Sequence, residues 1–292
     1  MEVLDTPYSV EGTWLRGNLH THSTESDGVR APERVIDDYE ARNYDFLALS
    51  DHDVLVDPER YHQQTGLLLL PAVEVSANGP HLLHIGANEA VAPFEDRAAV
   101  IETIEQGSGF AVLAHPHWGE TFEHWSIDEL HRLDGATGIE IYNADIEIAT
   151  GSPDATDCWD QLLAAGEQCW GYANDDAHYP WQVARAWNVV QVDRQSPEAI
   201  LESLRTGRFY ASTGVTVESI RSSGNQLHIE TSDATEIQLY SDYGVLQQTC
   251  PGSSATFRLP EQLVHGSDHT YVRIECVGRG SERAWLQPMR FA

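Results

Sequence analysis

Short apolar runs alternate with amphipathic segments from residue 14 to about residue 192, and this alternation constrains the fold more than any other feature of the chain. Such a rhythm is typical of repeated β-α units and not of a helical bundle or a β-sandwich. The predicted strands are residues 14–20, 45–50, 67–75, 81–86, 110–114, 138–142, 169–173 and 186–192. About seven β-α units close a barrel, so we expect an α/β fold with a barrel of the (β/α)7 type, complete or distorted.

Helix starts are predicted at four places between these strands. Pro32 opens a segment whose apolar residues recur at helical spacing, and proline is favoured at the first position of a helix. Similar signals occur at Pro93, Ser126 and Ser196, and the two serines carry the side chain that caps a helix N-terminus.

The pattern changes after residue 214, where strand-like alternation continues without a convincing helix. The predicted strands of this part are residues 215–220, 226–230, 236–240, 255–259, 270–276 and 284–290. We therefore expect two domains, the barrel over residues 1–214 and a small all-β, sandwich-like domain over residues 215–292. Only three of the fourteen histidines follow His178, so the chemistry is expected in the first domain.

The charge of the chain excludes some partners. Its 17 basic and 46 acidic residues give a net charge of −29, which would repel duplex nucleic acid and anionic membranes over most of the surface. All 17 basic residues are arginine, and we interpret this bias together with the acidity as adaptation to high salt, which screens self-repulsion. A generally acidic surface without such adaptation is the alternative.

The cysteines and the N-terminal residues bear on location. The four cysteines form no C-x-x-C pair and are too few for a disulfide scaffold, which suggests a reducing compartment. The first twenty residues contain no apolar run, and the longest aliphatic stretch is residues 67–70. We expect neither a signal peptide nor a membrane span, and therefore a cytoplasmic protein.

Histidines and carboxylates gather at the C-terminal ends of the predicted strands. The first strand ends in a His-x-His pair whose rings, two residues apart in an extended segment, point to the same side and can hold one ion together. The full set is His20, His22, Asp51, His52, Asp53, Glu74, His115, His117, Asp175, Asp176 and His178. In barrels of β-α units this edge carries the active site, because loops from separate strands converge there.

Each of these motifs alone has an ordinary explanation. A lone His-x-His pair is usually two surface histidines, Glu74 could end its strand in solvent, and His115 could be a core histidine. Their coincidence at five strand ends favours a metal site. Imidazole together with carboxylate suits Zn, Mn or Fe better than Ca or Mg alone.

The order of these motifs carries a family resemblance. The matching segments are His20-x-His22, Asp51-His52, Pro71-Ala-Val-Glu74, Leu113-Ala-His115-Pro116 and Asp176-x-His178. Over residues 14–214 this order resembles the PHP (polymerase and histidinol phosphatase) superfamily, and the continuation through residues 207–214 into a small β domain resembles its CehA/McbA-type branch. The resemblance implies a distorted β/α barrel that binds two or three divalent ions (Mn, Zn or Fe) and hydrolyses phosphate esters.

The resemblance also implies a set of ligands. One ion would be held by His20, His22, Glu74 and Asp176. Glu74 would bridge to a second ion, held by His115 and by either His81 or His84. These two histidines lie three residues apart on one strand and face opposite sides, so only one can point into the site; His81 fits the resemblance better.

A third ion would be held by Asp27, His52 and His178. A histidine usually occupies the place of Asp27 in the three-metal pattern, so this position separates two-metal from three-metal members. Without a third ion, His52 and His178 would be free to contact the phosphate or to protonate the leaving alkoxide. The acceptor for the proton of the attacking water would be Asp176, Asp51 or Asp175, and we expect the adjacent acids mostly to orient histidines.

Two cations about 3.5–4 Å apart can lower the pKa of a bridging water, so the attacking group would be a metal-bound hydroxide. No G-x-S-x-G elbow or paired Cys–His motif offers another nucleophile. Arg208, Arg185 and Asn143 are candidates for contacting the substrate, although salt bridges to nearby acids are the alternative for both arginines. The aromatic side chains that could stack on a substrate ring, or simply pack in the core, are Trp118, Tyr142, Tyr179 and Trp181.

The sequence thus predicts a divalent-metal-dependent hydrolase that cleaves a phosphate mono- or diester of a small molecule or nucleotide. Two alternatives remain. The same metals could polarise the carbonyl of a carbamate or acyl ester. Alternatively, the metal could be structural, in a non-catalytic binding module whose β domain makes the contacts.

Overall fold

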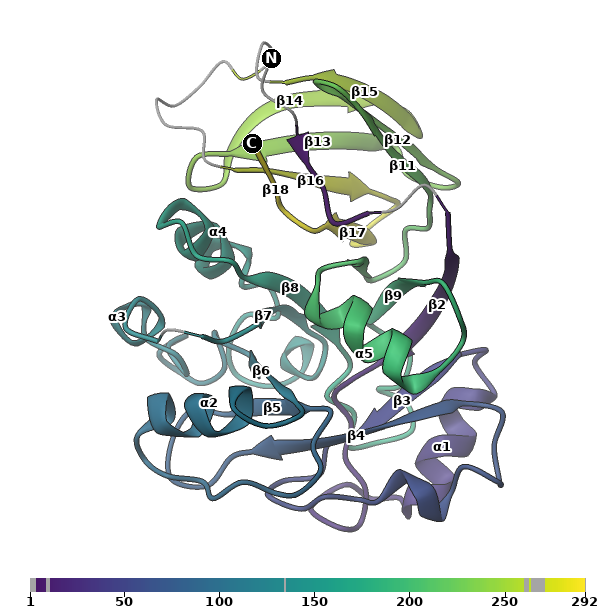
Figure 1. The fold of residues 1–292 in the computed structure, drawn as a ribbon, viewed down its shortest axis with the longest axis vertical. Coiled ribbons are helices and arrows are strands. Elements are labelled where there is room, and N and C mark those ends of the chain that lie inside the picture. Colours follow the sequence, from purple (N-terminus) through teal and green to yellow (C-terminus); the bar gives the residue numbers. More distant parts are fainter. Residues whose placement is uncertain (1–3, 9–10, 134, 260–262, 264–270, 292) are drawn as a thin grey trace.

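The computed structural model describes residues 4–8, 11–133, 135–259, 263 and 271–291, and it has two parts stacked along the long axis (Figure 1). The α/β part lies below and the all-β part above. Among the residues described, no helix is long and apolar enough to cross a membrane.

The α/β part is built around a curved sheet of nine strands, in the order β10-β9-β2-β3-β4-β5-β6-β7-β8. Its strands are β2 (Thr13–Asn18), β3 (Phe46–Leu49), β4 (Leu68–Val75), β5 (Leu82–Ile85), β6 (Phe110–Leu113), β7 (Gly138–Asn143), β8 (Trp170–Asn174), β9 (Trp187–Val192) and β10 (Phe209–Ser212). The eight strands expected here are therefore present. β10 is additional, and no strand was expected over its residues.

Strand direction shows why the barrel is distorted. β2, β3 and β4 are parallel, as are β6, β7 and β8, but β5 runs antiparallel to both of its neighbours and β9 antiparallel to β2 and β10. Only a short turn joins β4 to β5, and a connection without a crossover helix yields an antiparallel pair.

Asparagine side chains hold the seam between β8 and the β2–β9 pair. Asn188 Oδ1 accepts from Ala173 N (3.2 Å), and its Nδ2 donates to Ala173 O (2.9 Å). Asn174 Oδ1 accepts from Leu19 N (3.1 Å). Side-chain amides therefore supplement the short main-chain pairing between Thr21 and Ala177 where the barrel closes.

The helices are α1 (Pro32–Glu40), α2 (Arg97–Glu105), α3 (Ile127–Leu130), α4 (Thr156–Ala164) and α5 (Pro197–Arg205), with 3-10 turns η1 (Pro58–Arg60) and η2 (Asp145–Glu147). Ser126 and Ser196 cap α3 and α5 as expected, each accepting from a backbone N–H of its first turn. The start expected at Pro93 is wrong: α2 begins four residues later, because Asp96 supplies the capping oxygen to Ala98 N. α4 carries no side-chain cap, and its start was not predicted.

The β part packs two sheets face to face. Its strands are β1 (Leu4–Asp5), β11 (Val217–Ser223), β12 (Gln226–Thr231), β13 (Glu236–Ser241), β14 (Val245–Pro251), β15 (Ser254–Arg258), β16 (Tyr271–Val277), β17 (Arg283–Leu286) and β18 (Met289–Phe291). The single strand expected over residues 284–290 is two strands, broken at Gln287 and Pro288. β14 was not expected.

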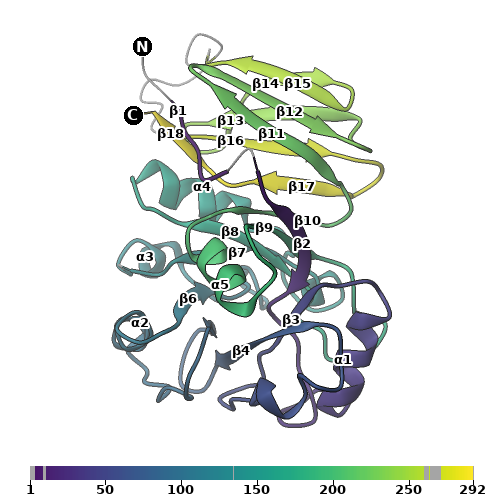
Figure 2. The ribbon, with the colours of Figure 1, turned by 45° about the vertical axis from the view of Figure 1, so that its right-hand side comes forward.

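The two parts are joined by main-chain pairing. β10 pairs with β9 of the barrel on one side and with β17 on the other, so one sheet runs through the expected boundary near residue 214. β1 pairs with β18, which places the segment at residues 4–5 on the β part although it precedes the barrel in sequence (Figure 2).

A buried ionic cluster reinforces this junction at α4. Arg273 of β16 donates from Nε to Asp160 Oδ1 and from an Nη to Oδ2, both at 2.6 Å, and its other Nη lies 2.5 Å from Glu275 Oε1. Tyr271 Oη also donates to Asp160 Oδ1 (2.7 Å). The Arg273 side chain is 2% exposed, so its charge is balanced by the two carboxylates and not by solvent.

Candidate metal centre

Two histidines and two carboxylates meet where β2, β4 and β8 end. His20 Nε2 lies 3.3 Å from Glu74 Oε2 and 3.2 Å from Asp176 Oδ1. His22 Nε2 lies 3.4 Å from Glu74 Oε2 and 2.9 Å from Asp176 Oδ1. All four side chains are buried. The residues that the resemblance implies for the first ion therefore lie within contact of one another.

Glu74 also touches the histidines implied for the second ion. Its Oε1 lies 2.9 Å from His81 Nδ1 and 3.0 Å from His115 Nε2. Its Oε2 lies 2.9 Å from His52 Nδ1. One carboxylate thus faces donors on both sides, the arrangement required of a bridging ligand.

A third group lies at the mouth of the site. Asp27 Oδ2 is 3.5 Å from His52 Nε2 and 3.4 Å from His178 Nε2, and Asp27 Oδ1 is 3.7 Å from His22 Nδ1. These four residues can gather their donor atoms around one point. The Asp27 side chain is 54% exposed, so this group is the most accessible of the three.

Atoms that lack hydrogen bonds show that the cluster suits cations. The buried side-chain atoms without a hydrogen-bond partner include His20 Nε2, His22 Nδ1, His52 Nδ1, Glu74 Oε2 and His115 Nδ1. An unsatisfied buried polar atom costs about 1–3 kcal/mol, so five in one place are better explained by an occupant that accepts lone pairs. The donor set of imidazole and carboxylate therefore fits divalent metal ions.

Glu140 of β7 orients the two inner histidines. Its Oε1 accepts from His20 Nδ1 (2.9 Å) and Asn174 Nδ2 (2.8 Å), and its Oε2 accepts from His115 N (2.8 Å) and Asn143 Nδ2 (2.9 Å). The proton of a neutral His20 ring is therefore held at Nδ1, which leaves the Nε2 lone pair directed at Glu74 and Asp176.

The electrostatics of the cluster keep its carboxylates ionised. Burial alone would raise the pKa of Glu74, but the facing His20, His115 and His52 rings hold it well below its usual range. Burial lowers the pKa of His20, but Asp176, Glu74 and Glu140 outweigh it and raise that pKa well above its usual value. The pKa of His52 is raised to about 8, because its contact with Glu74 outweighs burial. Without a cation, protons on the imidazoles balance the carboxylates.

Two of these residues have backbone conformations that favour glycine. His115 has φ of 28° and Asp176 has φ of 52°. Left-handed backbone at a non-glycine residue costs on the order of 1–3 kcal/mol and persists where surrounding contacts enforce it. Here the enforcing bonds are His115 N to Glu140 Oε2 and Asp176 N to His20 O (2.9 Å).

Strand alternation separates His81 from His84. Leu83 pairs with Glu74 across β4 and β5, so His81, two residues before it, lies on the same face as Glu74. His84 pairs with Val73 on the opposite face and packs against Gly109, where an added Cβ would lie 2.3 Å from its Nε2. Burial lowers the pKa of His84 to about 4. His81 faces the cluster, as expected, and His84 is a neutral core histidine.

Asp51 and Asp175, the two other candidate proton acceptors, fix the conformation of loops through hydrogen bonds. Asp51 accepts from both backbone and hydroxyl of Ser23 and of Ser26, which fixes the turn after His22. Asp175 accepts from the backbone N–H groups of residues 184–186 and from Tyr39 Oη. Their oxygens are thus occupied by these loops, whereas Asp176 Oδ1 faces His20 and His22.

The three residues expected to contact the substrate differ in their position relative to the cluster. Asn143 lies beside the cluster, but its Nδ2 is already donated to Glu140 and to Asp176 Oδ2 (3.1 Å). Arg185 is paired with Glu147. Arg208 lies at the other end of the barrel, because its carbonyl accepts from Gln191 N, and Gln191 pairs with Trp14 at the start of β2. The structure therefore does not bring Arg208 to the site.

His124 and Asp145 are two residues near the site that sequence reasoning did not identify. His124 Nε2 accepts from His81 N (2.8 Å), and its ring lies 4.7–4.9 Å, centroid to centroid, from those of His81, His115 and Trp118. Burial and the neighbouring histidines lower its pKa to about 2, so the ring is neutral. The only signal in the sequence was its place seven residues after His117, in a loop without regular structure.

The cluster opens into a cavity of about 150 Å³. Its lining consists of Asp27, His52, Glu74, His81, His115, Trp118, Asp145, Ile146, Asp176 and His178. Trp118 is 40% exposed at its rim, whereas Tyr142 packs on Trp285, and Tyr179 and Trp181 stack outside the cavity. Of the four aromatic candidates, only Trp118 lines it.

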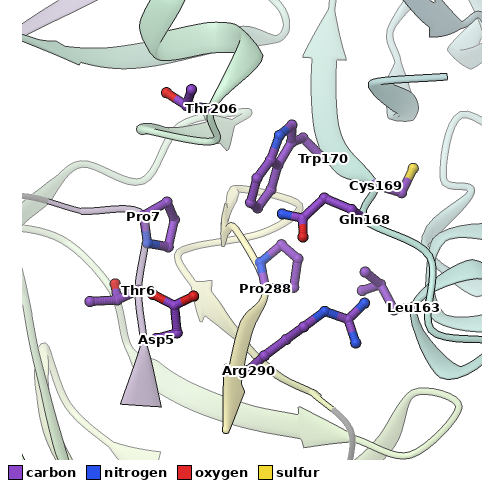
Figure 3. Close-up of a pocket in the computed structure, with 10 residues that line it drawn as sticks. All are labelled: Asp5, Thr6, Pro7, Leu163, Gln168, Cys169, Trp170, Thr206, Pro288 and Arg290. Carbon is purple, nitrogen blue, oxygen red and sulfur yellow. The ribbon is translucent and has the colours of Figure 1, made fainter. Parts of the chain in front are cut away.

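A second hollow of about 220 Å³ lies between the barrel and the β part (Figure 3). It is lined by Asp5, Thr6, Pro7, Leu163, Gln168, Cys169, Trp170, Thr206, Pro288 and Arg290. This lining contains no histidine and a single carboxylate, so it lacks the donors for a metal centre.

Comparison with known proteins supports this picture. Residues 169–209 match the family described as PHP-associated. The crystal structure of a two-domain protein containing a predicted PHP-like metal-dependent phosphoesterase, from Bacteroides vulgatus, aligns over 98% of both chains with a TM-score of 0.57 and 18% identity. The chain therefore shares the fold of this PHP-like two-domain protein. Its distorted α/β barrel with an all-β companion is the fold expected from the sequence, while the CehA/McbA-type assignment stays a prediction.

Two curated proteins match this chain over part of their length. A 3',5'-nucleoside bisphosphate phosphatase of Chromobacterium violaceum is 38% identical over 95 residues, which are 31% of this chain and 33% of that protein. A 5'-3' exoribonuclease of Haemophilus influenzae is 38% identical over 64 residues, 21% of this chain and 23% of that protein. The matches therefore span a third or less of these relatives.

Proposed function

We propose that this chain is a divalent-metal-dependent phosphoesterase. The observation that carries the proposal is the convergence of five imidazole rings on the two oxygens of Glu74, at the floor of a cavity open to solvent. The named activities of the two curated relatives are both cleavages of phosphate esters. A purely structural metal would have a closed coordination shell, whereas this cluster lines a cavity.

We assign the ligands as the resemblance implies. One ion would be held by His20, His22, Glu74 and Asp176. A second would be held by Glu74, His81 and His115. Asp27, His52 and His178, together with His22, offer a third position. Such ions, Mn, Zn or Fe, would polarise the phosphate and activate water.

The remaining side-chain atoms orient the substrate and move protons. His178 Nδ1 donates to Asp176 O (3.0 Å), which fixes its ring and directs Nε2 at the cavity. His52 and His178 are thus placed to bind a phosphate oxygen or to give a proton to the leaving alkoxide. Asp176 is placed to take a proton from water, because its Oδ1 lies among the donors of the cluster.

The test is a substrate panel with protein reconstituted in Mn²⁺ or Zn²⁺. We expect phosphate release from p-nitrophenyl phosphate or bis(p-nitrophenyl) phosphate, lost in His20→Ala and Glu74→Ala together with bound metal. Release of naphthol from naphthyl carbamate without phosphate release would instead establish the carbonyl hydrolase. Tightly held metal with no turnover of any ester would establish the binding module.

The expected small phosphorylated substrate, cytoplasmic location and adaptation to high salt remain predictions. The four cysteines are unpaired in the structure.

A further inference from the structure

One carboxylate of the cavity belongs to none of the three ligand groups described above. Asp145 stands at the start of η2 and lines the cavity next to Ile146. Gln182 Nε2 donates to its Oδ1, and the Gln182 side chain is itself buried. Gln182 Oε1 in turn accepts from the backbone N–H groups of His178 (2.9 Å) and Tyr179 (2.8 Å). The Asp145 carboxylate is therefore held in place by the loop that carries His178.

Only one oxygen of Asp145 is engaged in this way. Among the residues that the structure describes, no hydrogen bond is made to its Oδ2. The backbone is equally fixed, since Asp145 N donates to Asn143 Oδ1 (3.1 Å). A rigid carboxylate with one open oxygen can influence what enters the cavity.

Apart from the imidazoles of the candidate ligands, the described cavity lining offers no positive side chain to balance Asp145. Its lining contains four carboxylates, four imidazoles, Trp118 and Ile146, and the chain has no lysine at all. Arg185, the arginine nearest in sequence to His178, is paired with Glu147. Arg97 donates to the carbonyls of Phe94, Ser76 and Ala77. Neither guanidinium is available to a ligand in the cavity.

This lining differs from what a second phosphate requires. Phosphates that lie away from a metal are bound by arginine forks, by lysine or by helix N-termini, which supply opposite charge. Here Ile146 and Trp118 would meet the alcohol part of an ester, and the adjacent charge is negative. Such a wall accepts an uncharged alcohol and repels an anionic one.

We propose that Asp145 determines specificity by excluding a second phosphate, so that this chain hydrolyses small esters that carry a single phosphate on an uncharged alcohol. The inference rests on the proposed phosphoesterase function and narrows its substrate class. This specificity would distinguish the chain from a phosphatase that acts on bisphosphates and from a nuclease that degrades a nucleic-acid strand.

The experiment uses two probes that differ only in the second phosphate, propyl phosphate and propane-1,3-diol bisphosphate. With Mn²⁺-loaded wild-type protein, we expect kcat/KM for propyl phosphate to exceed that for the bisphosphate by about tenfold or more. Asp145→Asn, which keeps the acceptor for Gln182, should reduce this ratio to about threefold or less by lowering KM for the bisphosphate. The control Asp37→Asn removes an equal charge from an exposed site on α1 and should leave the ratio unchanged.

Binding gives a second readout without turnover. Calorimetric affinities of both probes for Ca²⁺-loaded protein should show the same preference and the same change in Asp145→Asn. A wild-type preference for the bisphosphate, an unchanged ratio in Asp145→Asn, or an equal loss of kcat on all substrates would overturn the assignment. If the protein discriminates between the two probes in binding but does not hydrolyse phenyl phosphate, the phosphoesterase function would be refuted and the role of Asp145 in specificity would not.

Discussion

Replacing Glu140 by glutamine should disrupt the centre although it changes no candidate ligand. The Glu140 side chain accepts four hydrogen bonds, two on each oxygen, from His20, His115, Asn143 and Asn174. Glutamine offers one oxygen and an amide group, so two of the four donors would face N–H groups. Burial would raise the pKa of Glu140, but His20 lowers it below its usual value, so the wild-type group is an anion at neutral pH.

The magnitude follows from those two lost bonds. Hydrogen bonds to a charged group contribute about 1.5–3 kcal/mol each, so Glu140→Gln should lower the free energy of unfolding by about 3–6 kcal/mol. Loss of a side chain that orients metal-binding histidines also lowers metal affinity, by about 10- to 100-fold. The loss of stability and the loss of metal affinity have one cause, because His20 and His115 are no longer held in a fixed orientation.

Urea unfolding of metal-free protein and metal titration by calorimetry measure the two effects. Glu102→Gln is the matched control, because Glu102 lies on the exposed face of α2 and accepts only from Gln106 Nε2 (2.9 Å). Unfolding of Glu140→Gln within about 1 kcal/mol of wild type, with unchanged metal affinity, would refute the reasoning.

Three further predictions concern the junction, the ligands and pH. Arg273→Met should lower the free energy of unfolding in urea by about 3–5 kcal/mol, because it leaves Asp160 and Glu275 as uncompensated buried charges. A change below about 1 kcal/mol, which is the contribution of a solvent-exposed salt bridge, would contradict this prediction. His81→Ala should lose bound metal, measured by elemental analysis, whereas His84→Ala should retain it, and the reverse result would make His84 the ligand. Metal affinity should rise from pH 6 to pH 8, and binding should release protons. The pKa values of His20 and His52 are raised, that of His52 to about 8, so these rings must lose protons to bind a cation. Calorimetry in buffers of different ionisation enthalpy measures this release, and its absence would show that the rings are already neutral.

Local pattern and the family resemblance together predicted the candidate ligands. His20 and His22 share a face because an extended chain alternates sides, and the same alternation puts His81 and His84 on opposite faces. The resemblance then favoured His81 as the one that faces Glu74. The strand ends could be located from apolar runs, since buried strands of a barrel are apolar along their whole length. Residues whose position depends only on their own strand were therefore predictable.

Residues that depend on distant partners were not. β14 and β10 are strands because they pair with β13, β9 and β17, and their own residues carry only weak alternation. Asn174 and Asn188 close the barrel seam across fourteen residues of sequence, through side-chain amides that have no periodic signature. His124 reaches His81 from a loop, and nothing in the intervening sequence fixes that approach.

Arg208 was wrongly expected at the site, because the prediction considered the chemistry of arginine and not the direction of its strand. It lies at a strand end, and arginine suits phosphate, but β10 runs antiparallel to β9, so its first residues lie with the start of β2 and not with its end. An arginine at that end of the barrel meets Asp193 instead (3.8 Å).

The backbone of the centre also could not be predicted, and its strain connects the ligands to Glu140. Nothing about His115 or Asp176 as residue types predicts φ of 28° or 52°. The hydrogen bond from His115 N to Glu140 Oε2 spans 25 residues of sequence and holds one of these conformations. The bond from Asp176 N to His20 O holds the other, and His20 itself is bonded to Glu140. Because both strained ligands depend on this carboxylate, Glu140→Gln should let the His115 backbone relax even when His20 keeps its ring in place. Chemical shifts of the His115 amide in metal-free protein would report that relaxation separately from any loss of metal.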